Sequence, residues 1–187
     1  RNPLAEPGLL GISSSAGLGA VVALYFGLTA LGTWLLPGAA MAAALLATLL
    51  LYGLTRSGTS NLTLILAGVA LSSLASALTA LALNLAPNPA DVQDIVIWLL
   101  GSISDRSLDD VGLVAPFVLL GLIFLLATAR SLDLLALGEG EAASLGVELS
   151  RLRALVVFGT ALAVGAGVAV SGTIGFVGLV VPHLTRL

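Results

Sequence analysis

Charge is scarce in this sequence. Only 9% of its 187 residues are charged and 58% are hydrophobic, whereas a typical soluble domain is about 25% charged. A chain with so few polar side chains cannot cover a globule in water, so lipid must surround most of its surface. The composition therefore predicts an integral membrane protein, in agreement with a mean hydropathy of +1.14.

Other absences exclude several kinds of site. The chain has no cysteine and a single histidine, which excludes disulfides, iron–sulfur clusters and cysteine-ligated zinc. We expect a structural role for His183 and no metal site. The basic residues form no run that would follow a nucleic-acid backbone. Because no GxxxxGK[ST] motif occurs, the chain does not hydrolyse ATP through a P-loop, and we expect no catalytic residue and no bound cofactor.

Apolar stretches of membrane-spanning length predict the fold. A helix needs about 20 apolar residues to cross the hydrocarbon layer, and alternating strand patterns are absent, so the predicted class is an all-α, polytopic transmembrane bundle. Five stretches qualify: 16–36, 39–55, 62–83, 111–129 and 154–171. We interpret 1–187 as one membrane domain. The chain begins without methionine or a signal peptide and stops without a closing tail, so we expect an internal piece of a longer polytopic protein.

The arginines predict the orientation of these spans. Alternation of the spans places two arginines on one side of the membrane, Arg106 and Arg186, and the other five on the opposite side: Arg1, Arg56, Arg130, Arg151 and Arg153. Loops with more arginine stay in the cytoplasm, so 56–61 and 130–153 are predicted to be cytoplasmic. On the other side, the apolar run 95–100 is too short to cross and predicts a surface or partly inserted helix.

The five predicted spans contain no ionisable side chain. Ionisable residues inside a membrane mark proton relays, ion sites and voltage sensors. Their absence argues against a proton-coupled carrier or a voltage-gated channel in this segment. Any energy for transport must then come from outside these helices.

Two spans carry small or hydroxyl residues at helical spacing. The series Gly159, Ala163 and Gly167 predicts a close helix contact, because small residues let backbones approach in membranes. The side of 62–84 that bears Ser72, Ser76, Thr79 and Asn84 is a candidate lining for a translocation pathway. Plain helix packing is the alternative for this second series, and it is the commoner use of such residues.

The segment 131–152 predicts a cytoplasmic coupling loop. It is too polar to span a membrane and too apolar for a solvated linker, and it predicts two short amphipathic helices joined at Gly138. The alternative is a connector lying on the membrane, but such connectors are rich in Lys and Arg, whereas this loop is acidic. The residues expected to dock a soluble partner are Leu135, Ala136, Leu137, Gly138, Glu139, Ala142, Leu145 and Gly146. We expect Glu139 either to pair with a basic residue of that partner or to cap the following helix.

Three ordered motifs resemble one family of transporters. The segments 2–20 (NPLAEPGLLGISSSAGLGA), 134–147 (LLALGEGEAASLGV) and 171–187 (SGTIGFVGLVVPHLTRL) are similar to the FecCD-type permease subunits of bacterial ABC importers for iron–siderophore, haem and cobalamin. With 62–74 (LTLILAGVALSSL), the resemblance covers essentially the whole chain. The motifs are specific for the family but not for its substrate.

The resemblance implies a ten-helix permease in the bacterial cytoplasmic (inner) membrane, of which this chain is about the third to the seventh helix. It implies a second permease copy or paralogue, two cytoplasmic ATP-binding subunits that use the ATP, and an extracytoplasmic substrate-binding protein. The family's coupling helices correspond to 134–146, and its pathway is lined largely by the helix at 62–84. Iron–siderophore is the expected substrate because it is the commonest in the family, with haem and cobalamin as alternatives.

A function of another class stays open: a membrane-embedded enzyme or scaffold whose active residues lie outside this chain. The lack of paired carboxylates, histidine clusters and nucleophile motifs disfavours it. Copurification with an ATP-binding subunit would separate the two.

Overall fold

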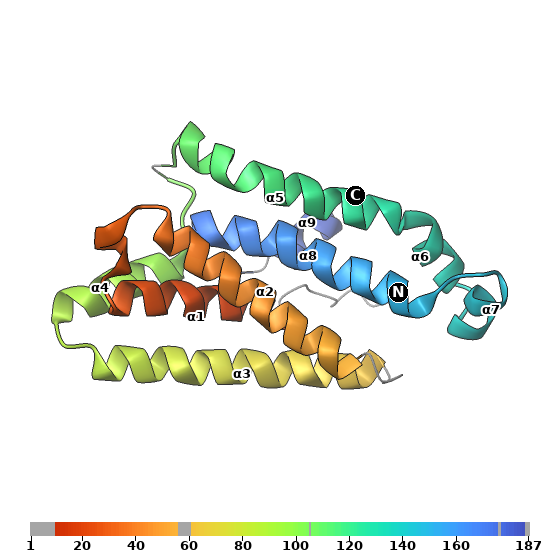
Figure 1. Ribbon diagram of the computed structural model, residues 1–187, viewed down its shortest axis with the longest axis horizontal. Helices are drawn as coiled ribbons and strands as arrows, with labels where there is room; N and C mark the ends of the chain where they lie inside the picture. Colours follow the sequence, from red (N-terminus) through yellow and green to blue (C-terminus); the bar gives the residue numbers. More distant parts are fainter. Residues whose placement is uncertain (1–9, 56–60, 105, 176, 186–187) are drawn as a thin grey trace.

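The computed structural model describes residues 10–55, 61–104, 106–175 and 177–185, and within these ranges no residue lies in a β-strand. The predicted all-α class is therefore confirmed (Figure 1). The helices are α1 Ile12–Tyr25, the 3₁₀ turn η2 Leu28–Leu31, α2 Leu35–Thr55, α3 Asn61–Leu85, α4 Pro89–Leu100, α5 Leu108–Ala127, α6 Ala129–Leu135, α7 Glu139–Ser144, α8 Leu149–Ser171 and α9 Val177–Leu184.

Among the described residues, four helices are long and apolar enough to cross a membrane. These are α2, α3, α5 and α8, and three of them contain the predicted spans 39–55, 62–83 and most of 111–129. The fourth helix, α8, contains the whole span predicted at 154–171 and begins five residues earlier, at Leu149. These four long apolar helices confirm the predicted polytopic class.

The predicted span 16–36 is wrong. Its helix, α1, has 14 residues and ends at Tyr25, which makes it about 21 Å long at 1.5 Å per residue and shorter than a bilayer core of about 30 Å. Gly27 follows with a φ of 62°, and η2 and Gly32 separate α1 from α2. Apolar character continues through 16–36, but the left-handed backbone at Gly27 stops the helix, and hydropathy does not report backbone conformation.

Pro37 and Gly38, which separate the predicted spans 16–36 and 39–55, do not break the helix, because both residues lie inside α2. Pro37 is the third residue of that helix. A proline in the first turn removes no helical hydrogen bond, since the amide groups there have no partner within the helix.

The core of the bundle is built from small side chains on α1, α2 and α8. Its buried members are Ile12, Ala16, Ala20, Ala40, Ala44, Ala161, Val168 and Ala169. Gly19 lies directly against the carbonyl of Ala39, so α1 and α2 approach with no side chain between them. Such close backbone approach is how helices gain contact in a membrane, where packing rather than hydrophobic burial holds them together.

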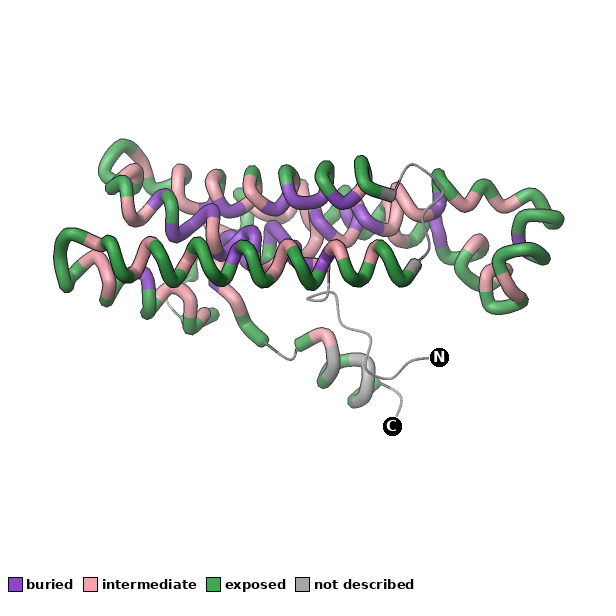
Figure 2. The backbone as a smooth tube through the Cα atoms, turned by 90° about the horizontal axis from the view of Figure 1, so that it is seen from below, coloured by how far each residue is buried: buried purple, intermediate pink, exposed green. Residues whose placement is uncertain are grey.

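The outer helices α3 and α5 leave their apolar side chains largely exposed (Figure 2). Only 11% of the α3 span and 6% of the α5 span is buried, against 44% of α8. In water such a surface would be costly, whereas lipid or further apolar helices would accept it. α5 packs on α8 and α3 on α1, so α8 and α1 form the interior.

Charged residues lie at the two ends of the bundle. Figure 1 places α6 and α7 at one end and α4 at the other, which separates Arg130, Arg151 and Arg153 from Arg106. The short helix predicted at 95–100 is the second half of α4, and its Ile95 is fully buried. Arg1, Arg56 and Arg186, which entered the predicted orientation, lie outside the described residues.

Candidate functional site

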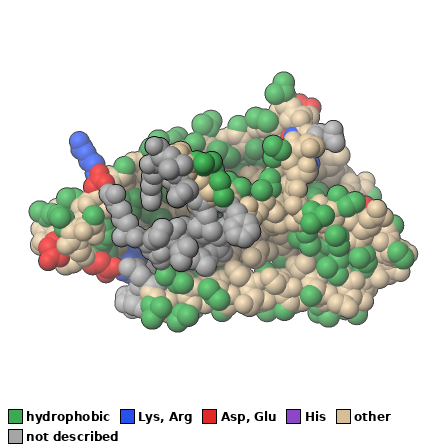
Figure 3. Space-filling view, turned by 180° about the vertical axis from the view of Figure 1, so that it is seen from behind, with side chains coloured by type: hydrophobic (Ala, Val, Ile, Leu, Met, Phe, Trp, Pro, Cys, Tyr) green, Lys and Arg blue, Asp and Glu red, His purple; other side chains and the backbone are tan. Residues whose placement is uncertain are grey.

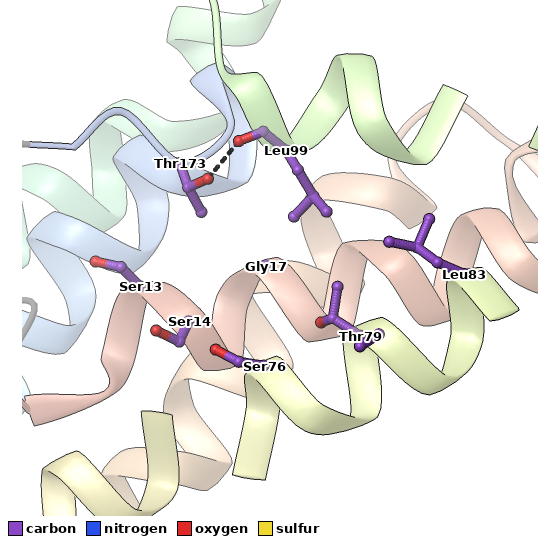
Figure 4. A pocket seen from close by; sticks show the side chains of 9 residues that line it. Ser13, Ser14, Gly17, Ser76, Thr79, Leu83, Leu99 and Thr173 are labelled. Carbon is purple, nitrogen blue, oxygen red and sulfur yellow. Dashed lines mark hydrogen bonds between the residues drawn. The ribbon is translucent and has the colours of Figure 1, made fainter. Parts of the chain in front are cut away.

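A cavity of about 370 Å³ lies between α1 and α3. The polar side chains that line it all carry hydroxyl groups: Ser13, Ser14, Ser76, Thr79 and Thr173. Figure 4 shows Ser13 and Ser14 on α1 facing the same space as Ser76 and Thr79 on α3, with Leu83 and Leu99 along the wall. Hydroxyl groups donate and accept hydrogen bonds without charge, so this cavity can contact polar groups of a passing molecule without binding it as an ion.

The cavity exists because α1 and α3 touch on either side of it. At the start of α1, Gly11 has a φ of 74°, and a Cβ there would stand 2.8 Å from the carbonyl oxygen of Gly68 and 3.2 Å from Ser72 Oγ. At the other end, the Tyr25 hydroxyl donates a hydrogen bond of 3.2 Å to the carbonyl oxygen of Leu85. These two contacts hold the helices together, and the space between them remains open.

The third wall comes from the junction of α4 with the turn after α8. The Thr173 hydroxyl donates to the Leu99 carbonyl at 2.6 Å, which is the bond drawn in Figure 4. The amide of Ser102 donates to the Ser171 carbonyl at 2.7 Å. Gly172, with a φ of 72°, lies directly against the Trp98 carbonyl, where a side chain would collide with backbone. The end of α4 is therefore held firmly on the end of α8.

The predicted pathway residues separate into two groups. Ser76 and Thr79 line the cavity. Ser72 lies instead at the helix contact with Gly11, and Asn84 is exposed and donates through Nδ2 to the Ala80 carbonyl of its own helix at 2.7 Å. These two residues do not line the cavity, because consecutive turns of α3 meet different parts of α1.

Sequence reasoning missed Ser13, Ser14 and Thr173 as cavity residues. The signal for the first two was present, since Ser13, Ser14 and Ser15 form a run of hydroxyl side chains in an otherwise apolar helix. No comparable pattern marks Thr173, which reaches the cavity only through its contact with α4.

The predicted ridge on α8 makes a close contact at two of its three positions. A Cβ on Gly121 of α5 would stand 2.7 Å from the Gly159 carbonyl oxygen and 2.8 Å from the Ala163 amide nitrogen. Gly167 does not share this contact: in the described part of the chain, a Cβ there has no atom within 4 Å. Residues four apart drift by about 40° per step around a helix, so Gly167 has turned away from α5 and is exposed.

The predicted coupling loop forms two short helices, α6 and α7, at one end of the bundle. Gly138, with a φ of 118°, separates them. At the end of α7 the amides of Gly146 and Val147 donate to the carbonyls of Ala143 and Ala142, which is the hydrogen-bond pattern of a Schellman motif with glycine in the left-handed position. Ala142 is fully buried.

Leucine and acidic side chains are exposed together on this loop. Leu137 and Leu145 are 63% and 59% exposed, and Leu135 borders an apolar groove of about 210 Å³. Figure 3 shows acidic side chains gathered at this end of the molecule. Exposed apolar side chains rimmed by polar ones are typical of a protein-binding surface.

Glu139 forms an ion pair within the chain. Arg153 Nη2 donates to its two carboxylate oxygens, at 3.1 Å and 3.3 Å. Glu139 is the first residue of α7, so it also stands at a helix N-terminus. The alternatives weighed from the sequence were a partner's basic residue and a helix cap, and the ion pair with Arg153 is a third role that no local pattern indicated.

These features define a multi-pass helical membrane protein with a hydroxyl-lined cavity between its helices and a two-helix surface at one end. The whole chain, residues 1–187, matches the FecCD transport family. The chain belongs to that family.

Individual relatives and a solved structure support the same family assignment. The chain is 44% identical to YvrB of Bacillus subtilis (strain 168), an ABC transporter permease protein described as uncharacterized, and covers 54% of it. It is 40% identical to the vitamin B12 import system permease protein BtuC of Salmonella typhi and covers 57% of it. It also resembles a solved transporter assigned to the metal-chelate type of ABC transporters, in an inward-facing conformation, with a TM-score of 0.91, 35% identity and 59% of that chain covered. All of the present chain is matched in each case, and it spans little more than half the length of these relatives.

Proposed function

We propose that this chain is part of the permease subunit of an ABC importer in a bacterial cytoplasmic membrane. The observation that carries the proposal is the match of the entire chain to the FecCD transport family. Relatives named as ABC permeases and a TM-score of 0.91 to an ABC transporter support it. In this proposal the permease moves its substrate across the membrane and separate cytoplasmic subunits hydrolyse the ATP, as the names of the relatives as ABC permeases suggest.

The cavity between α1 and α3 is part of the translocation pathway in this proposal. Ser76 and Thr79 provide hydroxyl groups from α3, and Ser13 and Ser14 provide them from α1. A pathway must let its substrate leave as well as enter, and neutral hydroxyl groups contact a polar substrate without the strong attraction of a buried charge. Ser72 and Asn84 are not required for this role.

The surface formed by α6 and α7 receives the ATP-binding subunits. Leu137 and Leu145 are its exposed apolar anchors, and Leu135, Ala136, Gly138, Ala142 and Gly146 shape the backbone that presents them. The surface faces the cytoplasm in the orientation that the arginines predict. A second permease copy or paralogue and an extracytoplasmic binding protein complete the transporter.

A metal chelate is the proposed substrate. A relative named for vitamin B12 import and a solved transporter assigned to the metal-chelate type support this class. Within the class, we propose iron–siderophore first, with haem and cobalamin as alternatives.

Uptake in proteoliposomes tests the proposal. The complete permease is reconstituted with its ATP-binding subunits and binding protein, and uptake of labelled ferric siderophore, haem and cyanocobalamin is compared with and without ATP. We expect ATP-dependent uptake of one of them. Failure of ATP-binding subunits to copurify with the permease, together with no uptake of any chelate, would contradict the proposal.

A substitution in the cavity tests the pathway separately. Thr79→Leu fills the cavity and should lower uptake roughly tenfold, the effect of a barrier raised by about 1.4 kcal/mol, while subunit association stays unchanged. Ser73→Leu is the matched control, since Ser73 is exposed on the same helix outside the cavity lining. Equal uptake by the two variants would show that the cavity is not on the pathway.

A further inference from the structure

The ion pair between Glu139 and Arg153 joins two different helices. Glu139 is the first residue of α7, and Arg153 is the fifth residue of α8. One guanidinium nitrogen contacts both carboxylate oxygens, at 3.1 Å and 3.3 Å. Both side chains also border the apolar groove that lies along the start of α8. The Arg153 side chain is 26% exposed, so the apolar wall shields most of it from water.

The opposite end of α7 is tied to α8 through the backbone. The amide of Val147 donates to the Ala142 carbonyl, and the next residue, Glu148, is already the N-cap of α8. Only the four residues 145–148 connect the two helices. The ion pair at one end and the turn at the other therefore hold α7 on α8 at two points.

α6 and α7 contact each other, and Gly138 lies at the bend between them. Gly138 has a φ of 118°, a conformation that residues with a side chain rarely adopt. A Cβ at this position would stand 2.5 Å from Glu141 Oε2. Hinges form at a few residues that can take up large changes in φ and ψ, and glycine suits that use because it lacks the side chain that limits rotation.

We propose that the ion pair makes α7 an extension of α8, with a hinge at Gly138, so that a movement imposed on α7 is delivered to α8. Glu139 is then a positioning residue that acts through Arg153, rather than a direct contact of the partner. The inference has two parts. The mechanical part is that α7 and α8 move together, and it does not depend on the proposed function. The transport consequence is that this movement couples ATP hydrolysis to uptake, and it rests on the proposed function.

α8 is suited to carry such a movement through the bundle. With 23 residues it is about 35 Å long, and it packs against α1, α2 and α5. The carbonyl of Ser171 at its far end holds Ser102, and Thr173 just beyond it lines the hydroxyl cavity. One continuous helix thus runs from the α6–α7 end of the bundle to the cavity wall.

Distances between spin labels test the mechanical part in the complete permease. Labels are attached at Ser144→Cys on α7 and Gly167→Cys on α8, both exposed positions. We expect one narrow distance distribution with the ion pair intact. Glu139→Gln, Arg153→Gln and the double substitution should broaden it equally, because each removes the same pair. Asp133→Asn, an exposed acid on α6, and Arg151→Gln, an exposed arginine on α8, are the matched controls and should leave it narrow.

Two results would overturn the mechanical part. One is a distribution that stays narrow in either single variant, and the other is equal broadening in the controls. Membrane abundance of each variant is measured alongside, and Arg153→Lys, which keeps the charge, should give an intermediate width even if a glutamine variant is poorly produced.

Uptake per ATP hydrolysed tests the transport consequence in the reconstituted transporter. The two glutamine variants should lower this ratio by roughly two- to fivefold, the factor expected from losing a partly exposed ion pair, and the double variant should be no worse than either. Association with the ATP-binding subunits should persist in all of these variants.

A Glu139→Gln variant that loses association while Arg153→Gln keeps it would overturn the inference in favour of a direct partner contact. Broadened distances in a permease that binds no ATP-binding subunit would instead contradict the proposed function and leave the mechanical part standing.

Discussion

The glycine at position 121 sets how closely α5 approaches α8. Its missing side chain leaves room for the Gly159 carbonyl and the Ala163 amide, so the two backbones touch. In a membrane this kind of contact is a main source of helix association. The ridge predicted on α8 was recognised from spacing, but its partner on α5 was not, because a single glycine in an apolar span has no distinguishing pattern.

Gly121→Ala should destabilise the permease by about 1–3 kcal/mol, the usual cost of adding a methyl group to a packed contact. The atoms that the new Cβ would meet are backbone atoms at 2.7 Å and 2.8 Å, which cannot turn away as a side chain can. The measurement is the midpoint of thermal unfolding of the purified complete permease in detergent.

Gly167→Ala is the matched control for this substitution. It brings the same gain in helix propensity on α8, and its Cβ enters open space, so the midpoint should not fall. If the two variants unfolded at the same temperature, the contact between α5 and α8 would not be as tight as the distances indicate.

At the scale of elements, the first turn of α5 carries a complete local signal for the start of a helix. The Asp110 amide donates to Ser107 Oγ at 3.2 Å, and the Ser107 amide donates to Asp110 Oδ2 at 2.9 Å. This reciprocal pair is a capping box. It satisfies two of the amide groups that every helix leaves without an internal partner at its start.

Removing this box should loosen the first turn of α5. Ser107→Ala leaves the Asp110 amide without its acceptor, and we expect a loss of about 0.5–2 kcal/mol. Thermal unfolding in detergent measures the loss, and hydrogen exchange at residues 108–111 locates it. Ser104→Ala, an exposed serine three residues earlier and outside the box, is the control. Equal exchange rates in the two variants would show that the box does not hold the helix end.

For the whole molecule, the two ends of the bundle are expected to lie on opposite sides of the membrane. An impermeant thiol reagent applied to intact cells should label Ser104→Cys but not Ser144→Cys, because the arginine-rich end stays in the cytoplasm. Both serines are exposed and the chain has no native cysteine. Labelling after permeabilisation is the control for reactivity. The opposite pattern in intact cells would reverse the proposed orientation and remove the α6–α7 surface from the cytoplasm.

The loop 56–61, predicted to be cytoplasmic with 130–153, is mostly outside the described residues. Its side of the membrane stays a prediction that follows from the same experiment, since α3 separates it from residue 104.

The amino-acid sequence by itself determined the membrane class, the all-helical fold, most of the long spans and the two short helices of 131–152. These follow from properties of neighbouring residues: hydropathy over about 20 positions, caps, and glycine between amphipathic segments. The family resemblance was likewise present in ordered segments of the sequence, and the match over residues 1–187 agrees with it.

Only the tertiary structure decided which distant residues meet. It placed Ser13 and Ser14 opposite Ser76 and Thr79, and it turned Gly167 away from α5. It also paired Glu139 at the start of α7 with Arg153 in α8. The physical reason is that hydropathy, caps and turns act between neighbours in the chain, whereas these contacts depend on how helices cross, and a crossing is set by side chains on both partners at once.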